Sequence, residues 1–211
     1  MISYEQKKYI QSIAAEVKLR EDGDLIKTAY NLLVRSDRAG QATETTVQNF
    51  GFAKEVQGDY LLDFCKRNNC LLPHPKISLP YLTEGGEAKI YFDGKRVYKV
   101  NTAVFYQSWL DYLKNLLVHN CIFSATRYHL IGFCLNEKSL NAVLTQPYVR
   151  CDQNTNLDLV KSELEELGFI LQRRNDYLHP QLNLILEDMH DENVLFREDR
   201  LFFIDTVFYF K

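Results

Sequence analysis

Apolar residues recur at helical spacing between positions 10 and 67, which predicts three helices. The first run consists of Ile10, Ile13, Ala14 and Val17. The second lies between a capping residue, Asp24, and a stop at Gly40, and it consists of Leu25, Ile26, Ala29, Leu32 and Leu33. The third covers residues 54–67 and ends at Asn68-Asn69. We expect these helices to form a small subdomain that covers a sheet.

The period changes after Pro73 and Pro75, because two prolines so close together forbid a continued helix. Residues 81–100 predict three strands, with a glycine turn at Gly85-Gly86 and a tight hairpin at Asp93-Gly94. Residues 104–119 predict a helix. Its apolar stripe consists of Phe105, Trp109, Leu113, Leu116 and Leu117.

Residues 127–134 and 140–144 predict two more strands. Pro147 has no amide proton, so we expect residues 145–149 to form an edge strand or a connector whose backbone groups can meet a ligand. Residues 157–167 predict an amphipathic helix that ends at Gly168. The pattern of residues 169–185 fits either strands or an irregular loop.

The composition is that of a folded globular protein, because 46% hydrophobic residues in a chain of 211 can bury one core or two small lobes. A net charge of -3 gives no electrostatic reason to bind nucleic acid or an anionic membrane, and we expect neither partner. No apolar run has the length of a signal peptide core or a membrane span, which favours a cytoplasmic location. Five scattered cysteines suggest reduced thiols, and Cys65, Cys70 and His74 lack a fourth ligand for zinc.

Candidate chemistry concentrates in residues 186–205. The pattern there is a polar loop, a short apolar strand, a charged turn, a second apolar strand and then an isolated carboxylate. A hairpin of this kind would hold Asp188, Asn193 and Asp205 on one side. Carboxylate and amide oxygens supply a base and hard metal ligands, so the trio predicts a magnesium-nucleotide site or a degenerate remnant of one.

The spacing Asp188-x-His190-x-x-Asn193, followed after a hairpin by Asp205, resembles the catalytic loop and metal-binding aspartate of kinase-like phosphotransferases, including the aminoglycoside phosphotransferases. Further segments that carry the resemblance are Gly85-Gly86, Val97-Tyr98-Lys99, His119-Asn120-x-x-Phe123, Ile131-Gly132-Phe133 and Gln146-Pro147-Tyr148-Val149. Residues 82–205 are thus similar to the kinase domain found in bacterial polyvalent proteins of phages and mobile elements.

This resemblance implies ATP and Mg²⁺ as cofactors. Lys99 would contact the nucleotide phosphates and be oriented by an acidic residue of the next helix, for which Asp111 is the candidate; Glu84 and Glu87 are the competitors. Gly85 and Gly86 would let backbone amides approach the phosphates. Residues Gln146 to Val149 would form the hinge whose main chain receives the adenine, with Gln146 and Tyr148 as the binding residues.

The resemblance also implies roles for the C-terminal trio. Asp188 would accept the proton of the attacking hydroxyl or orient that hydroxyl, and Asn193 and Asp205 would hold magnesium. His190 is expected to hydrogen-bond the loop into shape. His119 and His129 are expected on structural surfaces, and the aromatic residues near the C-terminus in a core or an interface.

The implied fold is α+β: a kinase-like two-lobed fold with an antiparallel N-lobe sheet, extra N-terminal helices and a reduced C-lobe. We expect helices in residues 1–72, an N-lobe with its hinge in 73–149, and the C-lobe in 150–211. Leu186-Glu187 replaces the usual His-Arg before the catalytic Asp, and only residues 206–211 follow Asp205. Because of these departures, we do not expect phosphorylation of peptides by the conventional kinase route.

Three functions remain open on the sequence. The leading one is an ATP- and magnesium-dependent phosphotransferase with a small-molecule or unconventional protein acceptor. The main alternative is a catalytically inactive kinase-like module that binds nucleotide or protein for a mobile element or phage. The third is an accessory interaction protein unrelated to nucleotides.

Overall fold

The computed structural model describes residues 1–41, 50–75, 78–137 and 139–211. This part of the chain is a mixed α+β structure with antiparallel sheets, as expected. It divides into two compact units. We call Lys18–Leu113 with Tyr128–Tyr148 the sheet unit, and Met1–Val17 with Lys114–Arg127 and Val149–Lys211 the hairpin unit. None of the described helices is long and apolar enough to cross a bilayer.

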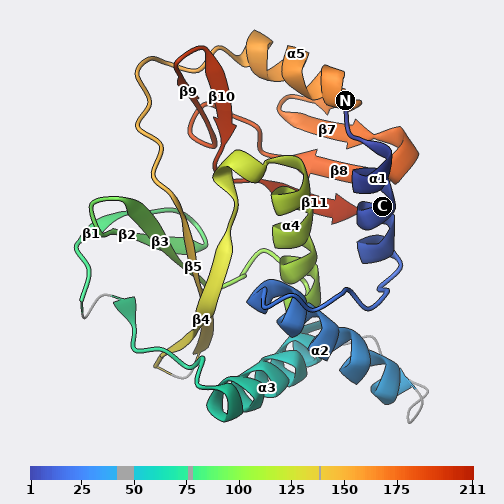
Figure 1. Ribbon diagram of the computed structural model, residues 1–211, viewed down its shortest axis with the longest axis vertical. Coiled ribbons are helices and arrows are strands. Elements are labelled where there is room, and N and C mark those ends of the chain that lie inside the picture. Colours follow the sequence, from blue (N-terminus) through green and yellow to red (C-terminus); the bar gives the residue numbers. More distant parts are fainter. Residues whose placement is uncertain (42–49, 76–77, 138) are drawn as a thin grey trace. The chain divides into compact units, whose positions relative to one another are not determined.

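The sheet unit contains a five-stranded antiparallel sheet with the order β1-β2-β3-β5-β4 (Figure 1). Its strands are β1 (Tyr81–Glu84), β2 (Ala88–Phe92), β3 (Arg96–Asn101), β4 (His129–Asn136) and β5 (Ser139–Pro147). The predicted β2–β3 hairpin is confirmed. The Asp93 carboxylate accepts hydrogen bonds from the amides of Lys95 and Arg96 at 2.8 and 2.7 Å, and these bonds hold its pKa below the usual value. Gly94 takes the positive φ of 97° that the turn requires.

The prediction for residues 145–149 is confirmed only in part: Thr145, Gln146 and Pro147 end the central strand β5, whereas Tyr148 and Val149 lie in the connector that follows it. Pro147 pairs with Arg96 of β3. On the other side, β4 begins at His129, opposite Thr145. The backbone of β5 therefore has no β4 partner at Pro147, so the missing amide proton costs no sheet hydrogen bond.

Helices α2 (Leu25–Gln41) and α3 (Phe50–Asn68) lie side by side and both contact β4 (Figure 1). The Asp24 carboxylate caps α2 by accepting from the Ile26 amide at 3.0 Å, as predicted. Helix α2 continues one residue beyond Gly40, to Gln41.

Helix α4 (Trp109–Ile122) starts later than predicted, so Phe105 lies outside it and is exposed. Trp109 packs edge-on against Phe133 of β4, with ring centroids 5.8 Å apart. Tyr91, Val100, Cys134 and Val143 form the core on the opposite sheet face.

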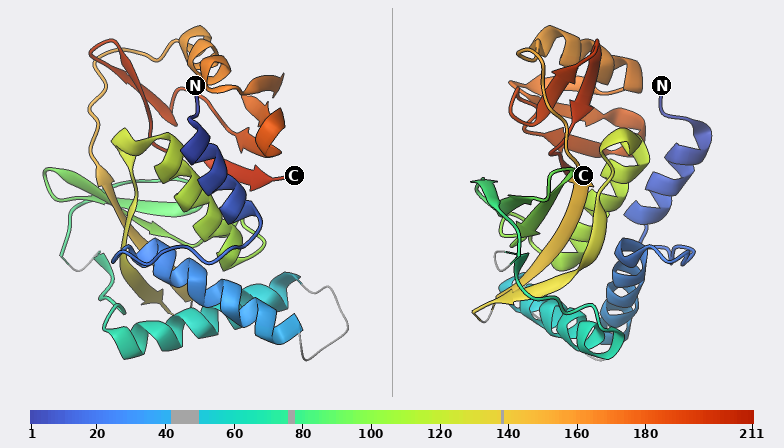
Figure 2. Two further views of the ribbon diagram at one scale, coloured as in Figure 1. Left: turned by 45° about the vertical axis from the view of Figure 1, so that its right-hand side comes forward. Right: turned by 60° about the vertical axis from the view of Figure 1, so that its left-hand side comes forward.

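The hairpin unit contains a four-stranded antiparallel sheet with the order β11-β8-β7-β6 and a separate β9–β10 hairpin (Figure 2). The strands are β6 (Ile170–Arg173), β7 (Asp176–His179), β8 (Leu184–Glu187), β9 (Val194–Arg197), β10 (Arg200–Phe203) and β11 (Val207–Phe210). Its helices are α1 (Tyr4–Ala14), α5 (Leu157–Leu167) and the second part of α4, with 3₁₀ turns at Ser124–Thr126 and Pro180–Leu182. Helix α1 ends before Val17, which is exposed. Gly168 ends α5 with a φ of 98°, as predicted.

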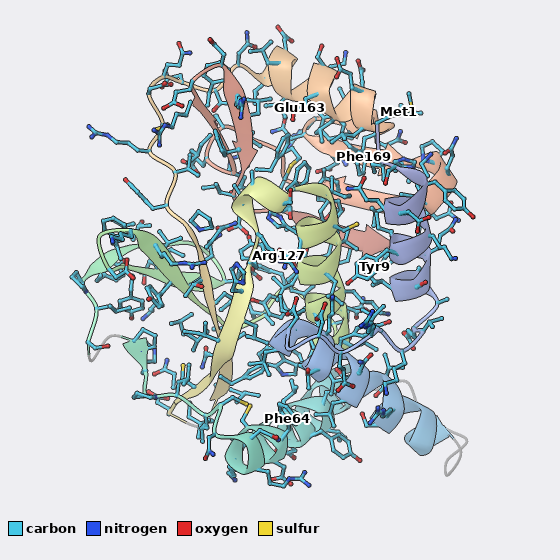
Figure 3. All side chains as sticks on the ribbon, viewed as in Figure 1. Met1, Tyr9, Phe64, Arg127, Glu163 and Phe169 are labelled. Carbon is cyan, nitrogen blue, oxygen red and sulfur yellow. The ribbon has the colours of Figure 1, made fainter. Side chains whose placement is uncertain are left out.

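Aromatic rings form much of the core of the hairpin unit. Phe203 of β10 stacks on Phe123 at a centroid distance of 4.1 Å. Phe169, labelled in Figure 3, packs against His179 and Phe208. Phe203 and Phe208, two of the aromatic residues near the C-terminus, are therefore core residues.

We expect Gly132→Ala to destabilise the protein by about 2–4 kcal/mol. Gly132 has a φ of 157°, and a Cβ there would lie 2.4 Å from the Cys70 carbonyl oxygen. That carbonyl cannot retreat easily, because it accepts from the Phe133 amide at 2.9 Å. Chemical denaturation would measure the loss. The control is Gly94→Ala, which has a positive φ but open space around it, and an equal loss in both variants would contradict the clash.

Candidate functional site

The C-terminal trio lies entirely within the hairpin unit, at the base of the β9–β10 hairpin. Asn193 immediately precedes β9, and Asp205 follows β10 by two residues. The Asn193 carbonyl oxygen accepts from the amides of Ile204 and Asp205, at 2.9 and 3.3 Å. The pairing of β9 with β10 thus brings Asn193 and Asp205 together, as the sequence predicted.

The side chain of Asn193 is oriented by Asp188. Its amide nitrogen donates to the Asp188 carbonyl oxygen at 2.9 Å and to the Asp188 carboxylate at 3.1 Å. Both partners are acceptors, which fixes the amide nitrogen on that side. Among the described residues no donor reaches Asn193 Oδ1, so this oxygen is the atom that remains for a ligand.

His190 shapes the loop, as expected. Its Nδ1 accepts from the amide of Glu192 at 3.2 Å, and its Nε2 lies 3.2 Å from the Asn193 amide nitrogen. Nε2 also lies 3.4 Å from the Asp188 carboxylate. The imidazole therefore ties Glu192 to Asp188 across the turn.

Asp188 is held in an unusual backbone conformation in a strongly acidic stretch. Its φ is 66°, and 61% of its side chain is exposed. Its amide donates to the Asp176 carboxylate at 3.3 Å. Burial, and then the negative charges of Asp176 and Asp188, raise the pKa of Glu187. A cation bound here would relieve this repulsion.

No three His, Cys, Asp or Glu side chains in the described residues gather closely enough to hold a metal ion by themselves. Asn193 Oδ1 and the Asp205 carboxylate are oxygen ligands of the kind magnesium prefers. Magnesium commonly completes its shell with phosphate oxygens and water, so two protein ligands fit this metal.

A buried hydrogen-bond network holds the residue that follows Asp205. His119 Nδ1 lies 2.7 Å from the Thr206 hydroxyl, and His119 Nε2 lies 3.0 Å from the Thr126 carbonyl. Thr126 donates in turn to the Phe203 carbonyl at 2.5 Å. The expectation of a surface position for His119 was wrong, because its side chain is fully buried. Helical position alone does not reveal this burial, since its partners are distant in sequence.

Lys99 lies in the sheet unit and is buried, with 6% exposure. It stands on β3 opposite Ile90 and Leu144, and Val97 and Gln146 share its sheet face. Its ammonium nitrogen is 3.4 Å from the Tyr128 hydroxyl and 5.1 Å from the centre of that ring. The sequence analysis missed Tyr128, for which no local signal exists.

The acidic residues considered as partners of Lys99 have other contacts. The Asp111 carboxylate accepts from the Ser108 hydroxyl at 2.6 Å, and Ser108 Oγ accepts from the Asp111 amide, a reciprocal cap on α4. Glu87 accepts from the Asn101 amide group at 2.8 Å. Glu84 lies 4.0 Å from Lys89.

Gly85 and Gly86 form the turn between β1 and β2 and line a small cavity of about 120 Å³. The surroundings of Gly85 are open, whereas a Cβ on Gly86 would lie 3.1 Å from the Phe105 ring. This turn can therefore present its backbone to a ligand at Gly85, and a side chain at position 86 would displace Phe105.

The hinge segment follows β5. The Tyr148 amide already donates to the Lys95 carbonyl at 3.3 Å, and the Tyr148 ring packs against Phe92 at 4.6 Å. Among the described residues no acceptor reaches the Val149 amide. Val149, which the sequence analysis placed in the hinge without a separate role, therefore offers the backbone donor there.

Two residues of α3 hold the start of α4 and were also missed. Gln57 Oε1 accepts from the Leu110 amide at 3.1 Å, while its amide nitrogen donates to Asp37 of α2. Lys54 donates to the carbonyls of Ala103 and Tyr106, just before α4. Desolvation of Lys54 lowers its pKa. Helix α3 thus holds the loop that connects β3 to α4 through hydrogen bonds.

A family model described as the serine/threonine/tyrosine kinase found in polyvalent proteins matches residues 54–211. The chain belongs to this family, Kinase-PolyVal, and the resemblance seen in the sequence is confirmed. Searches of the curated proteins and of the solved structures gave no match.

Proposed function

We propose that this chain transfers the terminal phosphoryl group of ATP to an acceptor hydroxyl in the presence of Mg²⁺. The observation that carries the proposal is that Asp188, Asn193 and Asp205 come together at the base of the β9–β10 hairpin, as a candidate base and two candidate metal ligands. A bond forms between the acceptor oxygen and the γ-phosphorus, and the bond from that phosphorus to the leaving ADP oxygen breaks. The hydroxyl proton leaves through Asp188 or is lost to solvent.

Asn193 Oδ1 and the Asp205 carboxylate would hold the metal. Magnesium bound there would neutralise the negative charge of the phosphates, which the two nearby carboxylates would otherwise repel. The hydrogen bonds from Asn193 to Asp188 keep the amide oxygen turned away from the base, so the two roles do not compete. His190 stiffens the loop that carries Asp188 and Asn193.

Lys99 would bind the nucleotide phosphates through its compact ammonium group. Its contact with Tyr128 orients the buried side chain, and Gly85 with Gly86 would bring backbone amides to the phosphates. The helix-capping contact of Asp111 supports a structural role for that residue, and an orienting role toward Lys99 would require Ser108 to give way.

Gln146, Tyr148 and Val149 would form the adenine hinge of a two-lobed kinase-like fold. The Val149 amide is the best donor to a ring nitrogen, because the Tyr148 amide is already bonded to Lys95. The Tyr148 ring, 42% exposed, offers an apolar surface beside it.

We expect ATP with Mg²⁺ to stabilise the protein against heat. Ligand at about 100 times its Kd stabilises a folded protein by about 2.7 kcal/mol, or roughly 5–10 °C in Tm for a chain of this size. A thermal shift assay should show this rise with ATP and magnesium, and a smaller one with ATP and a chelator. No shift at millimolar ATP with magnesium would contradict the proposal.

A catalytically inactive binding module is the second candidate. Leu186-Glu187 stands where active kinases carry His-Arg, and the pKa of Glu187 is raised by burial and neighbouring charge. An uncompensated acidic cluster beside the base is unfavourable for a phosphate-binding loop. Nucleotide binding without turnover would identify this second function.

A further inference from the structure

A hollow of about 550 Å³ lies in the sheet unit, where α3, the first turn of α4 and the β4–β5 hairpin meet. Its volume is within the range of ligand pockets in proteins. The residues that define its character are Glu55, Gly58, Asp59, Leu62, Trp109 and Leu140. None of the proposed nucleotide or metal residues lines it, so the hollow is a separate site.

The indole of Trp109 supplies a polar atom at the wall of this hollow. Trp109 is 4% exposed, yet among the described residues no acceptor reaches its Nε1–H. This N–H is open to solvent in the hollow, so a ligand that displaces the water there must bring an acceptor to replace the lost hydrogen bond. The indole nitrogen lies beside Gly58, because a Cβ on Gly58 would be 3.4 Å from it.

Gly58 keeps that side of the hollow open. It lies in the middle of α3, where glycine is less favourable than alanine. Alanine would fit, because contacts of 3.4 and 3.9 Å to the Trp109 ring are ordinary van der Waals distances. The glycine therefore serves neither helix stability nor close packing, and its effect is to leave the indole N–H uncovered.

Two carboxylates and one ammonium group line the hollow, so its net charge is negative, and the Lys54 ammonium already donates to the carbonyls of Ala103 and Tyr106. Glu55 and Asp59 are four residues apart on α3, both are exposed, and neither forms an ion pair within the described residues. Like charges at this spacing repel each other and destabilise a helix. A cation between them would remove the repulsion, whereas an anionic ligand would add to it. The half-buried Leu62 and Leu140 give the hollow apolar walls.

We propose that this hollow binds a peptide segment in which a bulky apolar side chain is flanked by arginine or lysine. The apolar side chain fills the hollow against Leu62 and Leu140. A main-chain carbonyl of the peptide accepts from Trp109 Nε1–H, and the basic side chains meet Glu55 and Asp59. A partner protein that displays such a segment would dock on α3 and α4.

The test uses the single tryptophan of the chain as its probe. The whole protein is titrated with a blocked peptide that alternates arginine with phenylalanine, and Trp109 emission and the one indole N–H resonance are followed. We expect a saturable emission change and a downfield shift of that resonance. A matched peptide with glutamate in place of arginine, and one with serine in place of phenylalanine, should each bind at least about tenfold more weakly.

Variants separate specific docking from general attraction to an acidic protein. Gly58→Leu fills the hollow and should abolish the signal, while Gly58→Ala keeps the fold as a packing control. The surface variant Glu55→Lys/Asp59→Lys should weaken binding by roughly three- to tenfold. The charge-matched control Glu163→Lys/Glu166→Lys lies on α5, where Figure 3 labels Glu163, and should have no effect.

Each alternative outcome overturns the proposal. Equal binding of the glutamate peptide would show that the rim does not select for a basic ligand. An equal loss in the α5 control would show that net charge alone governs the association. A signal retained in Gly58→Leu would place the peptide elsewhere.

Discussion

Asp205→Ala should abolish the magnesium-dependent part of ATP binding, with affinity for ATP in the presence of magnesium falling at least about tenfold. The carboxylate is the only charged ligand that the proposed metal site contains, since Asn193 contributes a neutral amide oxygen. The substitution leaves the backbone bond from residue 205 to the Asn193 carbonyl available, so the hairpin base should remain intact. Calorimetric titration with ATP, with and without magnesium, measures the effect.

Asp191→Ala is the matched control for Asp205→Ala. Asp191 lies on the loop before β9 that carries Asp188 and Asn193. It is exposed, and the structure shows no hydrogen bond or ion pair from its side chain within the described residues. The control removes the same charge and should keep ATP binding within about twofold. If Asp205→Ala retains full magnesium dependence, or if both variants lose it equally, Asp205 is not the metal ligand.

Local signals in the sequence predicted the elements that hold the proposed metal ligands. Two short apolar runs on either side of the charged turn at residues 197–200 predict a hairpin, and a hairpin brings its two ends together, next to Asn193 and Asp205. The same reasoning succeeded for the Asp93-Gly94 turn and for Gly168, where a positive φ is a property of the residue type. Features that depend on a few neighbouring residues could thus be predicted from the sequence.

Features that depend on contacts with residues far away in the chain could not be predicted from the sequence. Helix α4 starts late because residues before it are held by Lys54, which lies almost fifty positions earlier on α3. Strand β11 exists because Val207–Phe210 pairs with β8, and its sequence alone suggested only an aromatic cluster. His119 is buried because Thr126 and Thr206 satisfy both of its ring nitrogens. Tertiary contacts decide these positions, and spacing within the chain does not report them.

Asp188→Asn should reduce ATP turnover by about 10²–10⁴-fold while nucleotide affinity changes little. Asparagine has nearly the same shape, and its side-chain oxygen can still accept the hydrogen bond from Asn193, so the loop geometry should persist. What it cannot do is accept a proton from the attacking hydroxyl. The measurement is steady-state ADP release by the whole chain, paired with ATP titration of each variant.

Asp191→Asn supplies the comparison for the loss of one carboxylate from the loop, and it should turn over ATP at the wild-type rate. Both the ATP turnover rate and the ATP affinity are needed, because the active phosphotransferase and the inactive binding module both bind ATP and differ only in turnover. Slow turnover in Asp188→Asn with normal binding identifies a catalytic base. Equal and barely detectable rates in the wild type and Asp188→Asn, with ATP bound by both, would instead identify the inactive binding module, in which the Asp188–Asn193 contact serves only to hold nucleotide and metal.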